Sequence, residues 1–151
     1  MSLRHILRQQ AQELADQTLG LQITQPKAGW IHTLRVALGM TGPQLGERLG
    51  VKKARISQME HMEAEGRITL QQLRKAANAL GCELVIAFQP RESAEAIIAR
   101  QARKKAALLM GETDLHMRLE KQGLDNDRYE KELKRIAEEF IRQMPRDLWD
   151  D

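Results

Sequence analysis

Two glycines four residues apart, Gly46 and Gly50, constrain the fold of this chain more than any other feature. They lie in the stretch "LGERLGVKKARISQME", residues 45–60. Glycine inside a helix costs about 0.5–1 kcal/mol relative to alanine, so Gly46 indicates that two helices cross too closely for a side chain. Gly50 then supplies the backbone conformation of a tight turn between them. The spacing predicts a helix-turn-helix.

Helical periodicity on both sides of Gly50 supports this hairpin. We expect one helix over residues 41–49, capped by Thr41, and a second over residues 52–61. Four apolar side chains form the small core that sets the crossing angle: Leu45, Leu49, Val51 and Ile56. Met59 joins Ile56 on the inward side of the second helix.

The rest of the chain is predicted to be mainly helical. Apolar periodicity, caps and breakers predict further helices over 3–19, 30–38, 70–81 (capped by Thr69), 92–110, 113–122 and 127–144. The stretch 62–68 is expected to be a loop. We divide the chain into an N-terminal helix and linker (1–28), a helix-turn-helix domain (29–90), and a helical C-terminal region for dimerisation or partner binding (91–151).

One strand is expected, at about residues 83–88 within "CELVIAF". Its apolar run from 84 to 88 predicts burial on both faces or in an interface. Within the chain only "LQIT" (21–24) could pair with it. We therefore hypothesise that the strand pairs with its counterpart across a two-fold axis, which would make an intermolecular sheet in a dimer.

Charge is distributed unevenly along the chain, whose formal net charge is +3. Residues 26–61 carry six basic and two acidic side chains, whereas residues 112–151 carry eight basic and twelve acidic side chains. A basic segment of this kind fits a polyanionic partner, and the acidic end would face away from it.

Composition argues against several function classes. Aromatic residues make up only 3%, too few for stacking on single-stranded nucleic acid. No apolar run approaches the about 18 residues of a membrane span, and the N-terminus turns polar too early for a signal peptide. The chain has a single cysteine, Cys82, and four histidines that lack metal-ligand spacing, so no metal site is predicted. It shows no nucleophile–base pair, so neither an enzyme nor a cofactor site is predicted.

The outward face of the second hairpin helix is the candidate binding surface. At about 100° per residue, the residues pointing outward are Lys53, Ala54, Ser57, Gln58 and His61. Small or amide side chains can meet base edges in a major groove while Lys and Arg reach phosphates. The alternative is an ordinary solvated charged surface, on which Ser57 would hydrogen-bond back to the preceding turn.

Roles within this surface follow from position. Lys52, at the helix start, and Arg55, on its flank, are predicted to hold phosphates. Lys53, Ser57 and Gln58 are predicted to read bases, and Ala54 leaves room for the groove. The predicted DNA-binding set is completed by Thr41, Gln44 and His61.

Five other residues are interpreted individually. Trp30 is expected in the core, and Cys82 as a small buried residue. Glu60 and Glu63 could pass for paired carboxylates, but a helix cap or salt bridge fits them better. Trp149 is either an anchor for a partner or part of a tail folded back onto the last helix. The amphipathic stripe of the last helix closes the core, the dimer or a partner interface.

The stretch "IHTLRVALGMTGPQLGERLGVKKARISQMEH…RITLQQLRKAANALG" resembles the XRE family of λ-repressor-like helix-turn-helix regulators. The likeness covers about residues 30–81. It implies double-stranded DNA binding, commonly by a dimer on a palindromic operator. In that family Gln44 would contact a phosphate, and the Lys53–Gln58 face would read bases.

Most of the chain also resembles a small bacterial family called mobile mystery protein A. The segments "PKAGWIHTLRVALGMT", "LEKQ" and the terminal "LWD" carry this likeness. It implies an autoregulating, antitoxin-like repressor in the bacterial cytoplasm, associated with the nucleoid, with a Fic-domain toxin as partner. The inhibitory Ser/Thr-x-x-x-Glu-Gly/Asn motif of Fic antitoxins is not matched, because His61 stands where Ser or Thr is required before Glu65. The alternative is an antitoxin that acts mainly by gripping the toxin through its helical C-terminal region.

Overall fold

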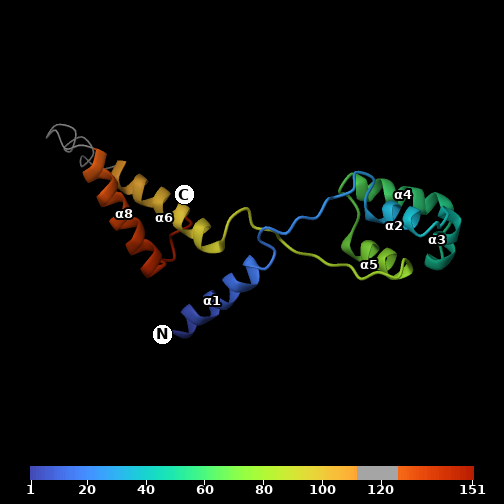
Figure 1. Cartoon of the computed structure of the whole chain (residues 1–151), viewed down its shortest axis with the longest axis horizontal. Coiled ribbons are helices and arrows are strands. Elements are labelled where there is room, and N and C mark those ends of the chain that lie inside the picture. The colour runs from blue at the N-terminus through green and yellow to red at the C-terminus, as the bar shows by residue number, and fades with distance from the viewer. Residues whose placement is uncertain (112–125) are drawn as a thin grey trace. The chain divides into compact units, whose positions relative to one another are not determined.

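The computed structural model describes residues 1–111 and 126–151 (Figure 1). Within these ranges the chain forms seven helices: α1 (Leu3–Asp16), α2 (Trp30–Ala37), α3 (Gly42–Leu49), α4 (Lys53–Ala64), α5 (Leu70–Ala79), α6 (Ala94–Gly111) and α8 (Asn126–Gln143). They fall into two compact units. One, the α2–α5 unit, comprises residues 21–87. The other, the α6/α8 unit, comprises residues 1–20 and 88–151.

The α2–α5 unit closes around one apolar core. Its buried members come from all four helices and from the residue that follows α5: Ile31, Leu45, Ile56, Met59, Ala76 and Leu80. Both threonine caps expected from the sequence are present as capping boxes, with Thr41 and Gln44 starting α3, and Thr69 and Gln72 starting α5. Each box satisfies backbone N–H groups that the first turn of a helix leaves unpaired. The caps therefore fix where the helices on either side of the hairpin begin.

The α6/α8 unit is built on the packing of α6 against α8. Small alanines on α6 meet Leu133 and Ala137 of α8 in a second core. The C-terminal tail folds back so that Leu148 is completely buried, and the Leu148 carbonyl accepts a hydrogen bond of 2.9 Å from the Gln101 amide on α6. The sequence left two alternatives for the tail, and the structure shows the one in which it folds back onto the helices, although Trp149 itself remains 53% exposed.

Helix α1 is attached to this unit at its C-terminal end. The Asp16 carboxylate accepts a hydrogen bond of 2.9 Å from the backbone N–H of Ala94, the first residue of α6. The Thr18 hydroxyl donates to the Phe88 carbonyl at 2.7 Å. These contacts group α1 with the C-terminal helices, whereas the linker that follows it belongs to the α2–α5 unit.

The prediction of a strand at about residues 83–88 is wrong. These residues form no strand in the structure, and the apolar side chains from 85 to 88, which were predicted to be buried, are exposed, with Val85 at 82% and Phe88 at 93%. A strand needs a neighbouring strand to exchange backbone hydrogen bonds, and neither this segment nor residues 21–24 adopts that pairing. The hypothesis of an intermolecular sheet rested on this strand, so it has no support from the structure.

Smaller differences concern helix ends and one aromatic residue. Helix α1 ends at Asp16, whereas a helix to residue 19 was expected, and α4 continues to Ala64 into the expected loop. Trp30 was expected in the core but is 41% exposed. It begins α2, and Ile31 occupies the core instead. The helix predicted over 113–122 lies outside the described residues. Among the residues described, no helix is both long and apolar enough to cross a membrane.

Candidate nucleic-acid interface

The hairpin of α3 and α4 is held by a close backbone approach at Gly46. The Val51 N–H donates to the Gly46 carbonyl at 2.8 Å, and a Cβ added at Gly46 would lie 2.5 Å from the Val51 carbonyl oxygen. Gly50, between them, has a φ of +70°, the left-handed conformation that favours glycine. The glycine pair thus has the two roles that the sequence predicts for it.

Replacing Gly46 with alanine should lower the free energy of unfolding of the α2–α5 unit by about 1–2 kcal/mol. The added methyl group meets backbone that cannot move without opening the turn, and overpacking of this kind costs about 1–3 kcal/mol, offset in part by the higher helix propensity of alanine. Urea unfolding would be followed by the fluorescence of Trp30 in a Trp149→Phe background. Gly42→Ala in the same helix is the control, because its Cβ would make only an ordinary contact of 3.5 Å with the flexible Lys53 side chain. Equal stability of the Gly46 variant and its parent would contradict the close approach.

Helix α4 presents to solvent the residues that were predicted to face outward. Lys53, Ala54, Ser57, Gln58 and His61 are all exposed, while Ile56 and Met59 are buried beneath them. Lys52 occupies the N-cap position of α4, where no side chain caps the helix. The N–H groups of Lys53 and Ala54 therefore stay available to an anion such as a phosphate, whereas the Arg55 N–H donates to the Lys52 carbonyl at 2.9 Å.

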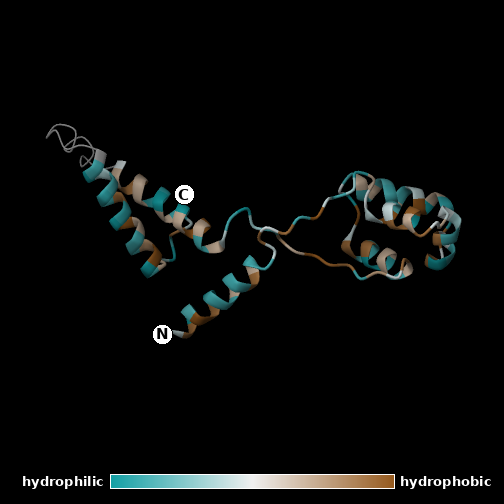
Figure 2. Ribbon diagram, viewed as in Figure 1, coloured by the Kyte–Doolittle hydropathy of each residue, from teal (hydrophilic) through white to brown (hydrophobic). Residues whose placement is uncertain are grey.

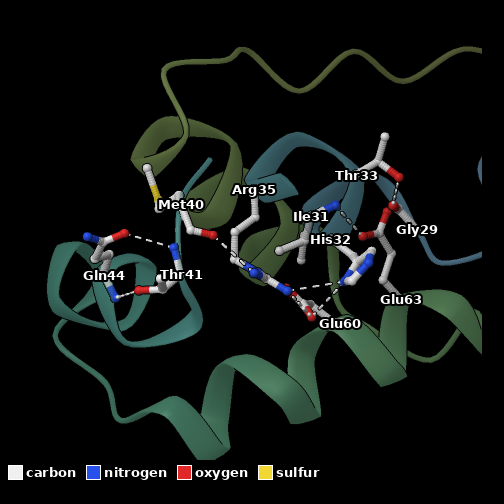
Figure 3. A network of polar contacts seen from close by, with 10 residues as sticks. All are labelled: Gly29, Ile31, His32, Thr33, Arg35, Met40, Thr41, Gln44, Glu60 and Glu63. Carbon is white, nitrogen blue, oxygen red and sulfur yellow. Dashed lines mark hydrogen bonds and ion pairs between the residues drawn. The ribbon is translucent and has the colours of Figure 1, made fainter. Parts of the chain in front are cut away.

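The start of α3 lies beside the start of α4. A Cβ on Gly42 would lie 3.5 Å from the Lys53 Cγ, so the stem of Lys53 runs over the first turn of α3. In the capping box the Gln44 side-chain oxygen accepts from the Thr41 N–H at 2.8 Å, and the Thr41 hydroxyl accepts from the Gln44 N–H at 3.3 Å. Figure 3 shows the amide nitrogen of Gln44 directed away from Thr41. Gln44 is thus fixed as a hydrogen-bond donor, as a phosphate contact requires.

Arg55 and Gln58 form a pair on α4 rather than acting separately. The Arg55 guanidinium donates to the Gln58 side-chain oxygen at 2.7 Å. Arg55 is half-buried and Gln58 is exposed, so the Gln58 amide is the more accessible member of the pair. Ser57, between them, has no side-chain hydrogen bond among the contacts of the described residues.

His61 is set apart from the other candidates. It lies eight residues beyond Lys53, about 12 Å along a helix axis. Its imidazole Nε2 is 3.4 Å from a carboxylate oxygen of Glu65. A neighbouring carboxylate repels phosphates, so the surface that the hairpin brings together consists of Thr41, Gln44 and the first two turns of α4.

A polar network that the sequence did not identify as a unit holds α2 on α4 (Figure 3). The Arg35 guanidinium contacts both Glu60 carboxylate oxygens, at 2.5 and 3.3 Å, and donates to the Met40 carbonyl at 3.0 Å. His32 lies 3.2 Å from the same carboxylate. Arg35 thus belongs to the scaffold, although it counts toward the basic charge of residues 26–61. Its pairing with a glutamate 25 positions later leaves no local signal in the sequence.

Glu63 caps α2 from a distance. Its two carboxylate oxygens accept from the N–H groups of Trp30 and Ile31, both at 2.8 Å. A carboxylate at a helix N-terminus is favoured by the helix dipole. The cap and salt bridge predicted for Glu63 and Glu60 are confirmed, and both fix the angle at which α4 is presented.

Replacing Glu60 with glutamine should lower the free energy of unfolding of the α2–α5 unit by about 2 kcal/mol at neutral pH, since hydrogen bonds to charged groups contribute about 1.5–3 kcal/mol. Burial opposes ionisation of Glu60, but the hydrogen bonds and charges of Arg35 and His32 outweigh it, so the pKa of Glu60 lies below its ordinary value.

The sign of the pH dependence follows from that lowered pKa. The contribution of ionised Glu60 is fully present above the ordinary glutamate pKa and is lost as the pH falls through the lowered pKa of the folded state. The stability difference between the parent chain and Glu60→Gln should therefore shrink in strongly acidic solution. A difference that stays constant from neutral to strongly acidic pH would contradict a structural role for the Glu60 charge.

Comparison with known families agrees with this geometry. Residues 31–86 match a family model described as helix-turn-helix. In both sequence and geometry this part of the chain resembles a helix-turn-helix domain. No curated protein and no solved structure matches the chain.

The helix-turn-helix match supports the λ-repressor-like resemblance and a DNA-binding regulator. It does not confirm the wider resemblance to mobile mystery protein A. The matched region covers α2 to α5 and leaves α1, α6 and α8 outside it. Within the described residues no cluster of three or more histidine, cysteine or acidic side chains could hold a metal ion.

Proposed function

We propose that the protein is a sequence-specific regulator of transcription that binds double-stranded DNA with α4 in the major groove. The observation that carries the proposal is the outer face of α4. It joins exposed small and amide side chains to two lysines at an N-terminus that no side chain caps. In helix-turn-helix proteins the N-terminal residues of the second helix contact base edges.

The contacts suggest how each residue acts. Lys52 and Gln44 donate to phosphates on either side of the groove, and Thr41 acts through Gln44. Lys53, Ser57 and Gln58 face the bases. Because Arg55 already occupies the Gln58 oxygen, the Gln58 amide acts as a donor. We therefore expect Gln58 to select an acceptor such as guanine O6 or thymine O4, rather than the donor–acceptor pair of adenine.

The protein acts as a homodimer on a two-fold operator in this proposal. Repressors of this architecture place two recognition helices in successive major grooves, about 10–10.5 base pairs apart. Autoregulation of its own operon, in an antitoxin-like role, follows from the family resemblance given above.

The test is selection of bound duplexes from a random DNA pool by the full chain, followed by sequencing. We expect an enriched motif with two-fold symmetry, and tighter binding to it than to unrelated duplexes by about 10³-fold or more. Binding that depends on salt but enriches no sequence would refute the proposed specificity.

A second candidate function, binding of a Fic-type toxin by the α6/α8 unit, is favoured by the large apolar side chains that this unit exposes: Leu108, Leu109, Ile141 and Trp149. Deletion of residues 112–151 cannot test it, because Leu133 and Leu148 are core residues. Co-purification of the neighbouring gene product with the parent chain, and its loss with Leu109→Gln and Trp149→Ala, would support this function.

A further inference from the structure

Helix α1 has an apolar face that its own unit leaves uncovered. None of residues 3–16 is buried, and Leu3, Leu7 and Leu14 are 71%, 56% and 66% exposed. Figure 2 shows apolar residues along this helix. At about 100° per residue the three leucines and Ile6 lie on one side. We call these four residues the α1 face.

The opposite side of α1 is the one turned toward the rest of the unit. Arg8, Gln12 and Asp16 are the half-buried residues of the helix, and they follow one another at intervals of one turn. The polar side of α1 is thus partly covered, and its apolar side faces solvent. This is the reverse of the arrangement expected for a helix that packs on its own domain.

The α1 face therefore needs a cover that the described chain does not supply. Isolated helices shorter than about 12–15 residues are marginal in water, and α1 has 14 residues. Among the described residues, the hydrogen bonds that join it to the unit lie at its C-terminal end, at Asp16 and just beyond it. Burial of the α1 face would supply the stabilisation that a helix of this length needs.

The charges of α1 indicate what covers it. Of the charges not on the side that its own unit covers, Arg4 lies in the first turn and Glu13 in the last turn, and both are exposed; the helix has no acidic residue in its first turn and no basic residue in its last. Each sign thus stands at the end of the helix where the helix dipole disfavours it. A second α1 in antiparallel orientation brings its acidic end level with the basic end of the first, and opposes the two dipoles.

We propose that the α1 face is a homodimerisation surface, on which the α1 helices of two copies pack antiparallel across a two-fold axis. With the axis between Arg8 and Gln9, Leu3 of each copy lies level with Leu14 of the other. A two-fold axis makes such a surface self-complementary. The choice of a second copy also rests on the proposed two-fold DNA site, which requires a dimer.

The size of the surface sets the strength of the pairing. A helix of 14 residues is about 21 Å long, and its single face is smaller than the about 800 Å² per partner of a stable interface. The dimer is therefore weak in free solution, and binding of two adjacent half-sites on one duplex strengthens it by raising the effective concentration.

Sedimentation equilibrium of the full chain, up to about 500 µM, tests the pairing. The parent chain is expected to approach twice its mass of 17.3 kDa. Leu7→Gln with Leu14→Gln is expected to weaken dimerisation about 100-fold, because each lost apolar contact counts twice in a symmetric pair. The control is Leu109→Gln, which changes a leucine of similar exposure, 51%, on α6 of the same unit. A parent chain that is monomeric throughout, or equal weakening by the control, would overturn the proposal.

Cross-linking tests the orientation. In a Cys82→Ser background, a Leu3→Cys chain mixed with a Leu14→Cys chain should form a mixed disulfide under mild oxidation in preference to a disulfide within either pure sample. Preferential cross-linking within the pure samples would refute the antiparallel arrangement.

The DNA selection experiment separates this proposal from the proposed function. If the chain is monomeric but still enriches a duplex motif, the α1 dimer is refuted and the proposed regulator function stands. If the chain dimerises through α1 but enriches no motif, the regulator function is refuted and the α1 dimer stands.

Discussion

Replacing Lys53 and Gln58 together with alanine should weaken binding to the selected duplex by about 100-fold or more. A good base contact contributes about 1–3 kcal/mol of discrimination, and each 1.4 kcal/mol changes the dissociation constant about tenfold. Both residues are exposed on the outer face of α4, with no core role that their loss would disturb. Binding to unrelated duplexes should fall much less, so the ratio of specific to non-specific affinity should drop.

The matched control removes the same two residue types from α5. Gln71 and Lys75 are exposed, and they lie in the same unit outside the hairpin. Gln71→Ala with Lys75→Ala should leave the selected motif and the specific affinity close to those of the parent chain. Titrations at several salt concentrations separate charge from readout, because each lost phosphate contact lowers the salt slope by about 1. Equal losses in both double variants would show that α4 has no special role.

Replacing Leu45 with alanine should destabilise the α2–α5 unit by about 3–4 kcal/mol, within the range found when a buried leucine is truncated and a cavity remains. Leu45 is completely buried where α3 meets the core beneath α4. Its loss therefore removes the support of the hairpin, and specific DNA binding should be lost at a lower temperature than in the parent chain.

The two tryptophans make this prediction specific to one unit. Trp30 lies in the α2–α5 unit and Trp149 in the α6/α8 unit, so single-tryptophan variants report each unit separately. Leu45→Ala should shift the urea midpoint seen by Trp30 and leave the midpoint seen by Trp149 in place. Leu148→Ala, at an equally buried leucine of the second core, should do the reverse. Coincident shifts at both tryptophans in either variant would contradict two separately cored units.

Local signals predicted much of the α2–α5 unit. Thr41 and Thr69 predicted helix starts because a threonine N-cap satisfies an N–H group within the first turn; the structure adds the glutamine three residues later, which completes each capping box. Gly46 and Gly50 predicted the hairpin because their constraints, a close approach and a left-handed turn, are also local.

Interactions distant in sequence were the ones missed. The apolar run at 84–88 resembles a buried strand, but burial requires a partner that a pattern of residues cannot supply, and Val85 and Phe88 are exposed. The side of α1 that faces its unit could not be foreseen either, because it depends on a contact between Asp16 and Ala94.

In the candidate site, too, the local features could be predicted from the sequence and the contacts between side chains could not. Helical periodicity predicted which residues of α4 face outward, because the core beneath that helix is regular. It could not predict that Arg55 holds Gln58, since that contact depends on side-chain conformation. Nor could it separate Arg35, paired with Glu60, from the basic residues that remain available to DNA.

The central claim is that α4 reads bases through its outer face. The most direct test repeats the selection from a random duplex pool with the parent chain and with Gln58→Ala, side by side. We predict that the variant loses preference at one base pair in each half-site, where the parent chain selects guanine or thymine, and keeps its preference elsewhere. Identical motifs from the two proteins, or no motif from the parent chain, would contradict the assignment of α4 as the recognition helix.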